Sequence, residues 1–187
     1  MTILVDMDDV LEQLLKAICR YNAEHYGTTV RAEDITDWEI VKFYPGMTRA
    51  EVMACEMDDE FWQTVDPMPG ADEALRKMIA DGHEVFIVTA TLYQTLRSKM
   101  DDLLFRCFPY ITWDRVITTC HKDMIKGDVL IDDGPHNLVR GEYRKILFEA
   151  PHNRSFDESS IGAVRVKNWE EAYAEVCRIA AEIENGQ

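Results

Sequence analysis

Short apolar runs alternate along this chain with segments of helical periodicity, and this alternation limits the folds that it can adopt. The runs are rich in valine and isoleucine, which favour buried strands. Strands that alternate with helices form a parallel sheet with helices on both faces. We therefore predict an α/β fold with strands over residues 2–6, 84–89, 115–118, 128–132, 145–148 and 163–166.

Helical periodicity marks the segments between these runs. Apolar residues recur at helical spacing over residues 10–26, and Gly27 ends that helix. Thr48 and Glu51, three residues apart, form a capping box that predicts a short helix over residues 48–57. Further helices are predicted over residues 71–80, 92–108 and 169–183.

Residues 28–69 differ from the regular pattern on either side of them. They contain two of the four tryptophans and are punctuated by turns at Pro45-Gly46 and at residues 67–70. We interpret this segment as a small helical cap inserted after the first strand–helix unit, with residues 1–27 and 70–187 as the core domain. Its aromatic residues are each expected to pack within the cap, and at least one of them to face a substrate: Trp38, Phe43, Phe61 and Trp62.

The chain carries a strong negative charge, because twenty lysines and arginines stand against thirty-five acidic residues, a net charge of −15. Such a surface repels a phosphate backbone and anionic lipid, so a nucleic acid polymer and a membrane are not expected partners. No apolar stretch reaches the roughly 18–20 residues of a membrane span. A small phosphorylated ligand is still compatible with this negative charge, because one bound metal ion makes the electrostatic potential around it positive.

Cysteine usage indicates a reducing compartment. The five cysteines include no Cys-x-x-Cys pair, which argues against a zinc site or a disulfide framework. The first residues carry no basic leader. We expect a cytoplasmic protein, and the sequence leaves open whether it is a monomer or a homodimer, the commonest assembly of soluble proteins.

Acidic and hydroxyl side chains stand at the carboxyl ends of three predicted strands. Asp6 and Asp8 follow the first strand, Thr89 ends the second, and the pair Asp132-Asp133 ends the fourth. A single acid after a strand is usually a turn or cap residue, which we expect of Asp9. Paired acids at two strand ends meet at one edge of a parallel sheet, where their repulsion favours a bound cation such as Mg²⁺.

These residue types suit phosphoryl transfer through an aspartate. Asp6 is the candidate nucleophile, and Asp8 could protonate the leaving oxygen and later activate water. The Thr89 hydroxyl and nearby main-chain N–H groups would hold phosphate oxygens, and Lys122 would add a positive charge.

Several charged residues near these motifs are expected to be solvated. Lys126 is the alternative to Lys122 and is expected at the surface. His121 and His136 are expected in solvated loops. Arg97 and Lys99 are expected on a solvated helix face.

The ordered motifs resemble those of the haloacid dehalogenase-like (HAD) phosphatase superfamily. Within it, the chain is most similar to the 5′(3′)-deoxyribonucleotidase family, and the similar segments run over most of the chain in family order. The motifs that carry the resemblance are Asp6-Met7-Asp8, Asp66-Pro67-Met68-Pro69-Gly70, Val88-Thr89, Lys122, Ile131-Asp132-Asp133 and Ala150-Pro151-His152-Asn153-Arg154.

The resemblance implies a Rossmann-like three-layer core and Mg²⁺-dependent hydrolysis of (deoxy)nucleoside monophosphates. It implies Asp6 as nucleophile and metal ligand, and Asp8 as acid and base with its main-chain carbonyl on the metal. The third metal carboxylate is Asp132 or Asp133. The phosphate contacts are Thr89, Ala90 and Lys122, and the pair Ala90-Thr91 departs from the family by lacking a hydroxyl directly after Thr89.

Other functions compete with this one. A HAD phosphatase that acts on another small phosphoester, such as a sugar phosphate, shares all the motifs, although the aromatic cap favours a base-bearing substrate. A phosphorylated receiver domain uses similar residues in another order and without a cap. A catalytically weak nucleotide-binding module would bind the same ligands without releasing phosphate.

Overall fold

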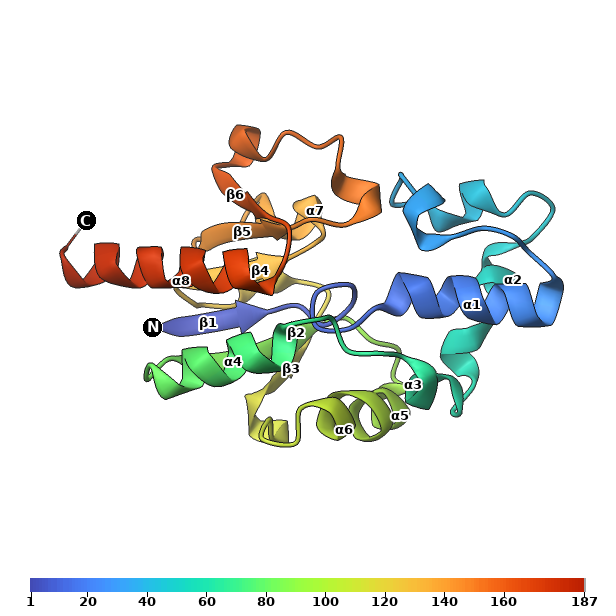
Figure 1. The fold of residues 1–187 in the computed structure, drawn as a ribbon, viewed down its shortest axis with the longest axis horizontal. Coiled ribbons are helices and arrows are strands. Elements are labelled where there is room, and N and C mark those ends of the chain that lie inside the picture. Colours follow the sequence, from blue (N-terminus) through green and yellow to red (C-terminus); the bar gives the residue numbers. More distant parts are fainter. Residues whose placement is uncertain (187) are drawn as a thin grey trace.

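The predicted strands pair into one six-stranded parallel sheet in the computed structural model, which describes residues 1–186 (Figure 1). The strand order is β3-β2-β1-β4-β5-β6, so β1 lies inside the sheet between β2 and β4. The strands are β1 (Thr2–Val5), β2 (Glu84–Thr89), β3 (Val116–Thr118), β4 (Val129–Asp132), β5 (Arg144–Phe148) and β6 (Ala163–Val166). The predicted α/β fold is confirmed, and each strand end lies within one residue of its prediction.

Apolar side chains cover both faces of the sheet. In β1, Ile3 and Val5 belong to the larger core, and Leu4 belongs to a smaller one on the opposite face. Alternate residues of a strand point to opposite faces, so a central strand needs apolar residues throughout. The α-helices are α1 (Leu14–Tyr26), α2 (Arg49–Val52), α3 (Phe61–Thr64), α4 (Ala71–Ala80), α5 (Leu96–Ser98), α6 (Phe105–Cys107), α7 (Pro135–Leu138) and α8 (Trp169–Glu184).

The first helix begins later than predicted. Asp9 adopts a left-handed φ of 56°, and its carboxylate accepts from the N–H of Leu15 at 3.0 Å. The chain therefore makes a loop before α1 starts at Leu14, and Asp9 caps the first turn as expected. Burial raises the pKa of Asp9 to about 8.

The helix predicted over residues 92–108 begins late and is not α-helical throughout. Residues 92–95 form a turn, and α5 begins only at Leu96. A π-helical segment, Lys99–Leu104, then separates α5 from α6. The wider π-helical turns bury Lys99 together with Met100.

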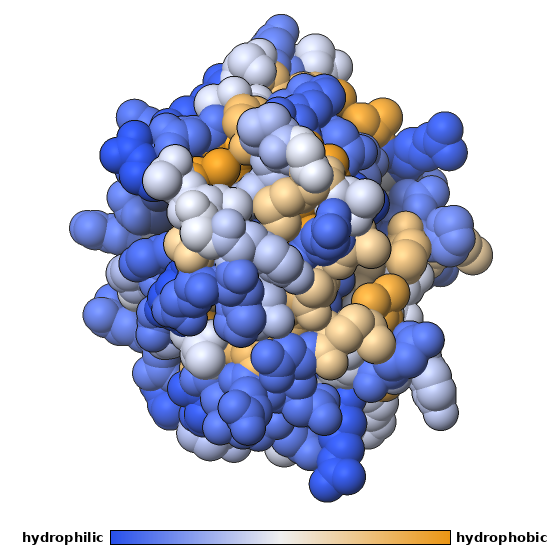
Figure 2. Space-filling model, turned by 90° about the vertical axis from the view of Figure 1, so that its right-hand side faces the viewer, coloured by the Kyte–Doolittle hydropathy of each residue, from blue (hydrophilic) through white to orange (hydrophobic). Residues whose placement is uncertain are grey.

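Residues 28–69 lie beyond the carboxyl ends of the strands, at the end of the molecule opposite both termini (Figure 1). The predicted capping box is present at α2, where the Thr48 hydroxyl and the Glu51 carboxylate each accept from the other's N–H. Asn22 in α1 donates to the carbonyl of Val52 at 3.0 Å, which links this segment to α1. Seen from this end, the surface is mainly hydrophilic with separate hydrophobic patches (Figure 2).

Short 3₁₀ turns complete the chain, and they lie over Ala32–Asp34, Ile40–Phe43, Ala54–Met57, Trp113–Arg115, Lys122–Met124, Pro151–Asn153 and Glu158–Ile161. Among the helices of residues 1–186, none combines the length and the apolar character that crossing a bilayer requires.

Trp169 joins α8 to the loop that follows β1, and we predict that this contact stabilises the fold. Its side chain is 1% exposed, and its Nε1–H donates to the carbonyl of Val10 at 2.8 Å. Trp169→Phe leaves that buried carbonyl unpaired, so the free energy of unfolding in urea should fall by about 1–3 kcal/mol. The matched variant Trp113→Phe, at a tryptophan that is 56% exposed, should change it by less than about 0.5 kcal/mol. Equal losses in both variants would contradict this role.

Candidate active site

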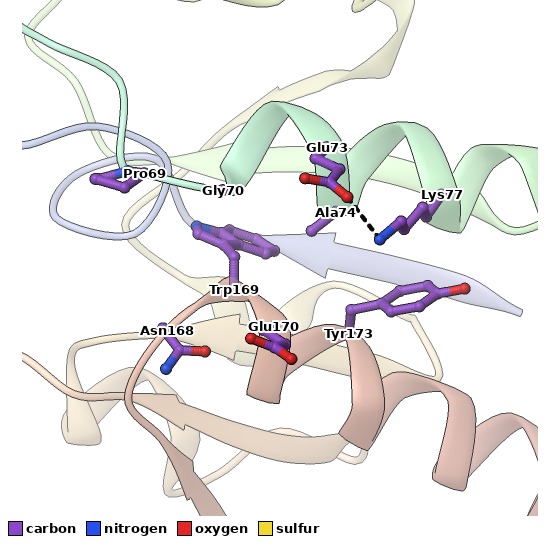
Figure 3. A pocket seen from close by; sticks show the side chains of 9 residues that line it. All are labelled: Pro69, Gly70, Glu73, Ala74, Lys77, Asn168, Trp169, Glu170 and Tyr173. Carbon is purple, nitrogen blue, oxygen red and sulfur yellow. Dashed lines mark ion pairs between the residues drawn. The ribbon is translucent and has the colours of Figure 1, made fainter.

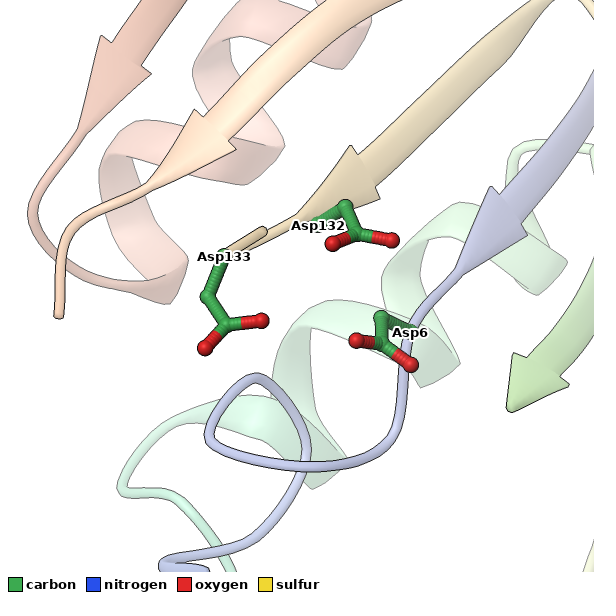
Figure 4. Close-up of side chains that lie close together, drawn as sticks. All are labelled: Asp6, Asp132 and Asp133. Atoms are coloured by element: carbon green, nitrogen blue, oxygen red, sulfur yellow. The ribbon is translucent and has the colours of Figure 1, made fainter. Parts of the chain in front are cut away.

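Three buried carboxylates meet where β1 and β4 end. The N–H of Asp6 donates to the carbonyl of Ile131 at 2.9 Å, which sets the end of β1 beside the end of β4. One carboxylate oxygen from each of Asp6, Asp132 and Asp133 lies within 4.8 Å of the others (Figure 4). The pairing of neighbouring strands therefore brings these predicted acids together.

The two acids that end β4 differ in their partners. Asp132 accepts from Lys122 Nζ at 2.7 Å, from Asn137 Nδ2 at 3.0 Å and from a main-chain N–H at 2.8 Å. Asp133 lies against His152, whose Nε2 is 2.9 Å from its Oδ2. Burial, followed by the charge of Asp132, raises the pKa of Asp133 well above its usual value. The protein thus supplies more donors to Asp132 than to Asp133.

Lys122 joins Asp6 to this cluster. Its ammonium lies 2.6 Å from Asp6 Oδ1 and 2.7 Å from Asp132 Oδ2, and the residue is buried. Burial lowers the pKa of Lys122, but the two carboxylates outweigh burial and raise it. Burial also raises the pKa of Asp6, against the lowering effect of Lys122. One ammonium facing three acids leaves a surplus of negative charge, and carboxylate oxygens are ligands that suit Mg²⁺.

Asp8 lies beside this cluster, between Lys99 and Glu12. The ammonium of Lys99 is 2.5 Å from Asp8 Oδ1 and donates to Oδ2 at 2.8 Å. Burial raises the pKa of Asp8, but Lys99 outweighs it, so the pKa is lowered overall. Glu12 is fully buried, and its pKa is raised by burial and then by Asp8. Asp8 thus stands between an ammonium and a buried carboxyl group.

The expectation that Lys99 lies on a solvated helix face is wrong. Its side chain is 2% exposed, whereas that of Arg97 is 92% exposed. The missed signal was its position next to Met100 and four residues before Leu103, both buried apolar residues of the same segment. Glu12 was also missed, because a carboxylate in the sequence is expected at the surface, whereas its side chain is fully buried.

Thr89 ends β2 beside these groups. It is fully buried, and its hydroxyl accepts from Lys99 Nζ at 3.3 Å. Ala90 follows it at the wall of a cleft of 380 Å³. The same cleft is lined by the charged residues Asp6, Asp8, Asp9, Asp37, Arg49, Lys122 and Asp133 and by apolar side chains of residues 14–53.

The four aromatic residues of the predicted cap have different surroundings. Trp38 is 57% exposed on the cleft wall, where its ring meets those of His136 and His152 edge to face. Trp62 is buried and borders a second cavity of 220 Å³ that Asp8 and Lys99 also line. Phe61 packs against Trp62 and the ring of Tyr21. Phe43 packs against the main core.

The histidines expected in solvated loops are both exposed, and one of them differs from its prediction in its secondary structure. His136 is exposed as expected but lies in the short helix α7 rather than in a loop, on the cleft wall against Trp38, where partial burial lowers its pKa. His121 and Lys126 are exposed as expected. From the sequence alone, His152 had no predicted role beyond its place in the motif of residues 150–154. Its contact with Asp133 arises because the 3₁₀ turn after β5 folds back toward the end of β4.

Another cleft, of 550 Å³, lies elsewhere, between α4 and α8 (Figure 3). Its charged residues include the ion pair of Glu73 and Lys77, with a distance of 2.7 Å between them. Gly70 turns the chain there with a φ of 83°, and a Cβ at this position would lie 3.3 Å from that of Trp169. None of the acids at the ends of β1 and β4 lines this cleft.

Comparison with known proteins decides the family. A family model described as "5' nucleotidase, deoxy (Pyrimidine), cytosolic type C protein" matches residues 1–182. The chain belongs to this family. It is therefore a phosphoric monoester hydrolase of the nucleotide phosphatase type, and the family expected from the motifs is confirmed.

Curated relatives support the same assignment. The chain is 33% identical over 171 residues to the 5'(3')-deoxyribonucleotidase of Bacillus subtilis (strain 168), covering 90% of this chain and 94% of the relative. It is 30% identical over 174 residues to the 5'(3')-deoxyribonucleotidase of Clostridium acetobutylicum, covering 92% and 93%.

Solved structures show the HAD fold. A HAD family hydrolase from Deinococcus radiodurans R1, with bound phosphate and sodium, superposes with a TM-score of 0.67 at 17% identity and covers 96% of both chains. A putative phosphoglycolate phosphatase from Lactobacillus delbrueckii subsp. bulgaricus superposes with a TM-score of 0.61 at 15% identity, covering 94% of this chain and 97% of the other.

The raised pKa of Asp133 predicts that the metal-free protein loses stability as the pH rises. A folded state that raises the pKa of an acid binds its proton more tightly, so this stability is complete below the unfolded-state value and is lost as the pH rises through the folded-state value. Between about pH 5 and about pH 7.5, wild type in EDTA should lose about 1 kcal/mol more unfolding free energy than Asp133→Asn.

Urea unfolding at both pH values checks this prediction. The matched variant Asp114→Asn, at an acid whose side chain is 76% exposed, should follow wild type. Mg²⁺ should raise the stability of wild type more than that of Asp133→Asn. Parallel pH dependences for wild type and Asp133→Asn would contradict the prediction.

Proposed function

We propose that this chain is a Mg²⁺-dependent phosphatase that hydrolyses (deoxy)nucleoside monophosphates through an aspartyl-phosphate on Asp6. The observation that carries the proposal is the contact of Asp6 with Lys122 at 2.6 Å, in a cleft that Asp8 and Asp133 also line. A nucleophile, a proton carrier, a cation for phosphate and acids for a metal thereby share one cavity.

The acids at the ends of β1 and β4 are proposed to hold the metal. Asp6, Asp133 and the main-chain carbonyl of Asp8 would be the protein ligands. Asp133 is preferred over Asp132 because both oxygens of Asp132 already accept from Lys122 or Asn137. Bound Mg²⁺ supplies positive charge that offsets the charges of the phosphate and the acids.

The side chains of this cleft account for both chemical steps. A carboxylate oxygen of Asp6 forms a bond to phosphorus while the bond from phosphorus to the leaving oxygen breaks, and Asp8 gives that oxygen a proton. Asp8 then takes a proton from water that attacks the aspartyl-phosphate, which releases phosphate and restores Asp6. The phosphate oxygens are held by Lys122, the Thr89 hydroxyl and the N–H of Ala90.

The cleft and the relatives favour a nucleotide as substrate. Trp38 exposes an aromatic surface on the cleft wall beside His136 and His152, which suits a base or a sugar face. The curated relatives are named 5'(3')-deoxyribonucleotidases. We further propose that residues 28–69 act as a cap over the core formed by residues 1–27 and 70–187.

A cytosolic location fits the same proposal. The family model is described as a cytosolic type, and all five cysteines are free: Cys19, Cys55, Cys107, Cys120 and Cys177. Free thiols are usual in a reducing compartment.

Phosphate release from a panel of deoxy- and ribonucleoside monophosphates and sugar phosphates tests this function. With Mg²⁺, release should concentrate on the nucleotides, and EDTA should stop it. Asp6→Asn should lower kcat by about 10⁴-fold or more, because no nucleophile remains. The matched variant Asp114→Asn, remote from the cleft, should keep wild-type activity.

The alternatives have distinct outcomes in this assay. Release from sugar phosphates alone would keep the mechanism and reject the substrate. Binding of nucleotides without release from any ester would indicate a binding module. Near-full activity of Asp6→Asn would reject the assigned nucleophile, and activity that persists in EDTA would reject the metal.

A further inference from the structure

Lys99 is a buried cation that the proposed chemistry does not use. Its ammonium lies 2.5 Å and 2.8 Å from the two carboxylate oxygens of Asp8 and donates to the hydroxyl of Thr89 at 3.3 Å. A lysine that is 2% exposed is stable only where partners replace its lost hydration. The burial of Lys99 therefore depends on these two residues.

The two buried lysines divide the site between them. Lys122 contacts Asp6, the proposed nucleophile, at 2.6 Å. Lys99 contacts Asp8, the proposed proton donor, and Thr89. Each lysine thus contacts a different carboxylate of the proposed reaction, Lys122 the nucleophile and Lys99 the proton donor.

We infer that Lys99 is a positioning residue, which holds the carboxyl group of Asp8 in the orientation that delivers a proton to the leaving oxygen. The inference rests on the proposed phosphatase function. The ammonium lies against both oxygens of Asp8 and donates a hydrogen bond to Oδ2, and this charge-assisted contact restrains rotation of the carboxyl group. Alignment matters because small displacements of a reacting group cost orders of magnitude in rate.

The local backbone anchors Lys99 for this role. Lys99 begins the π-helical segment, and its N–H donates to the carbonyl of Thr95 at 2.9 Å. Met100 and Leu103 of the same segment are buried in the main core. The ring centre of Trp62 lies 5.5 Å from the ammonium and limits its movement on another side. Such π-helical turns recur at functional sites.

The choice of leaving group separates positioning of Asp8 from binding of phosphate. An alkoxide such as that of a nucleoside needs a proton to depart, whereas p-nitrophenolate departs without one. A lost phosphate contact slows both esters equally. Asp8 also serves the later hydrolysis of the aspartyl-phosphate, which is the same for both esters, so the esters are compared by kcat/KM, which reports the steps up to departure of the leaving group. A misplaced proton donor lowers kcat/KM for the nucleotide far more than for p-nitrophenyl phosphate, and the ratio of the two values identifies it. This ratio does not depend on the fraction of enzyme that is folded.

The experiment compares Lys99→Met and Lys99→Arg with wild type, using the full chain and Mg²⁺. The control is Arg97→Met, two residues away on α5 with a side chain that is 92% exposed. We measure kcat and KM for p-nitrophenyl phosphate and for the nucleoside monophosphate that wild type hydrolyses fastest.

Lys99→Met should lower kcat/KM for the nucleotide by about 10²-fold or more and for p-nitrophenyl phosphate by about tenfold at most. Lys99→Arg should recover part of the nucleotide rate, because arginine keeps the charge and two donors. Arg97→Met should match wild type with both esters. Equal losses with both esters would overturn the inference.

A double variant tests whether Lys99 acts through Asp8. Added to Asp8→Asn, the change Lys99→Met should lower the nucleotide rate by no more than about twofold further. Losses that multiply would overturn the inference. Where Lys99→Met shows no cooperative melting, Lys99→Gln keeps a polar end in the buried site, and an unchanged ratio of rates in that variant would overturn it as well.

Failure of the proposed function is visible in wild type. Activity on p-nitrophenyl phosphate and sugar phosphates but on no nucleotide would contradict the substrate alone, and the best sugar phosphate then replaces the nucleotide in the ratio. A wild type that is inactive on every ester would contradict both the function and the role of Lys99.

Discussion

The buried ion pairs between lysines and carboxylates are the interaction on which this site depends. The sheet brings Asp6, Asp132 and Asp133 to one place, and burial makes their charges costly. Lys122 compensates two of them directly. Removing one partner of such a pair leaves an unpaired charge in the interior, which is why the acids and the lysine must be considered as one unit.

The arrangement of the strands makes this unit possible. β1 lies between β2 and β4, so its carboxyl end is next to the ends of both neighbours. Asp6 therefore has the acids of β4 on one side and Thr89, at the end of β2, on the other. Parallel strands place their carboxyl ends at one edge of the sheet, and a ligand that binds there meets residues that are far apart in the sequence.

Much of this could be predicted because the signals are local. Each strand is a short apolar run, and a residue at the end of such a run is fixed at the sheet edge once the fold is known. The roles proposed for Asp6, Asp8 and Thr89 follow from that position together with the family motifs. The helix predicted over residues 92–108 is present from Leu96 to Cys107, but its middle is π-helical, which has no simple periodic signature, and the burial of Lys99 there was missed.

The sequence by itself determined the alternation of strands and helices, the residues at the strand ends and the family, since all of these depend on neighbouring residues or on ordered motifs. Only the tertiary structure decided which groups compensate each acid. Lys99 meets Asp8 across 91 positions of sequence, and His152 meets Asp133 after the chain has turned back from β5. Burial and electrostatic pairing depend on distances in space, and no local pattern in the chain encodes those distances.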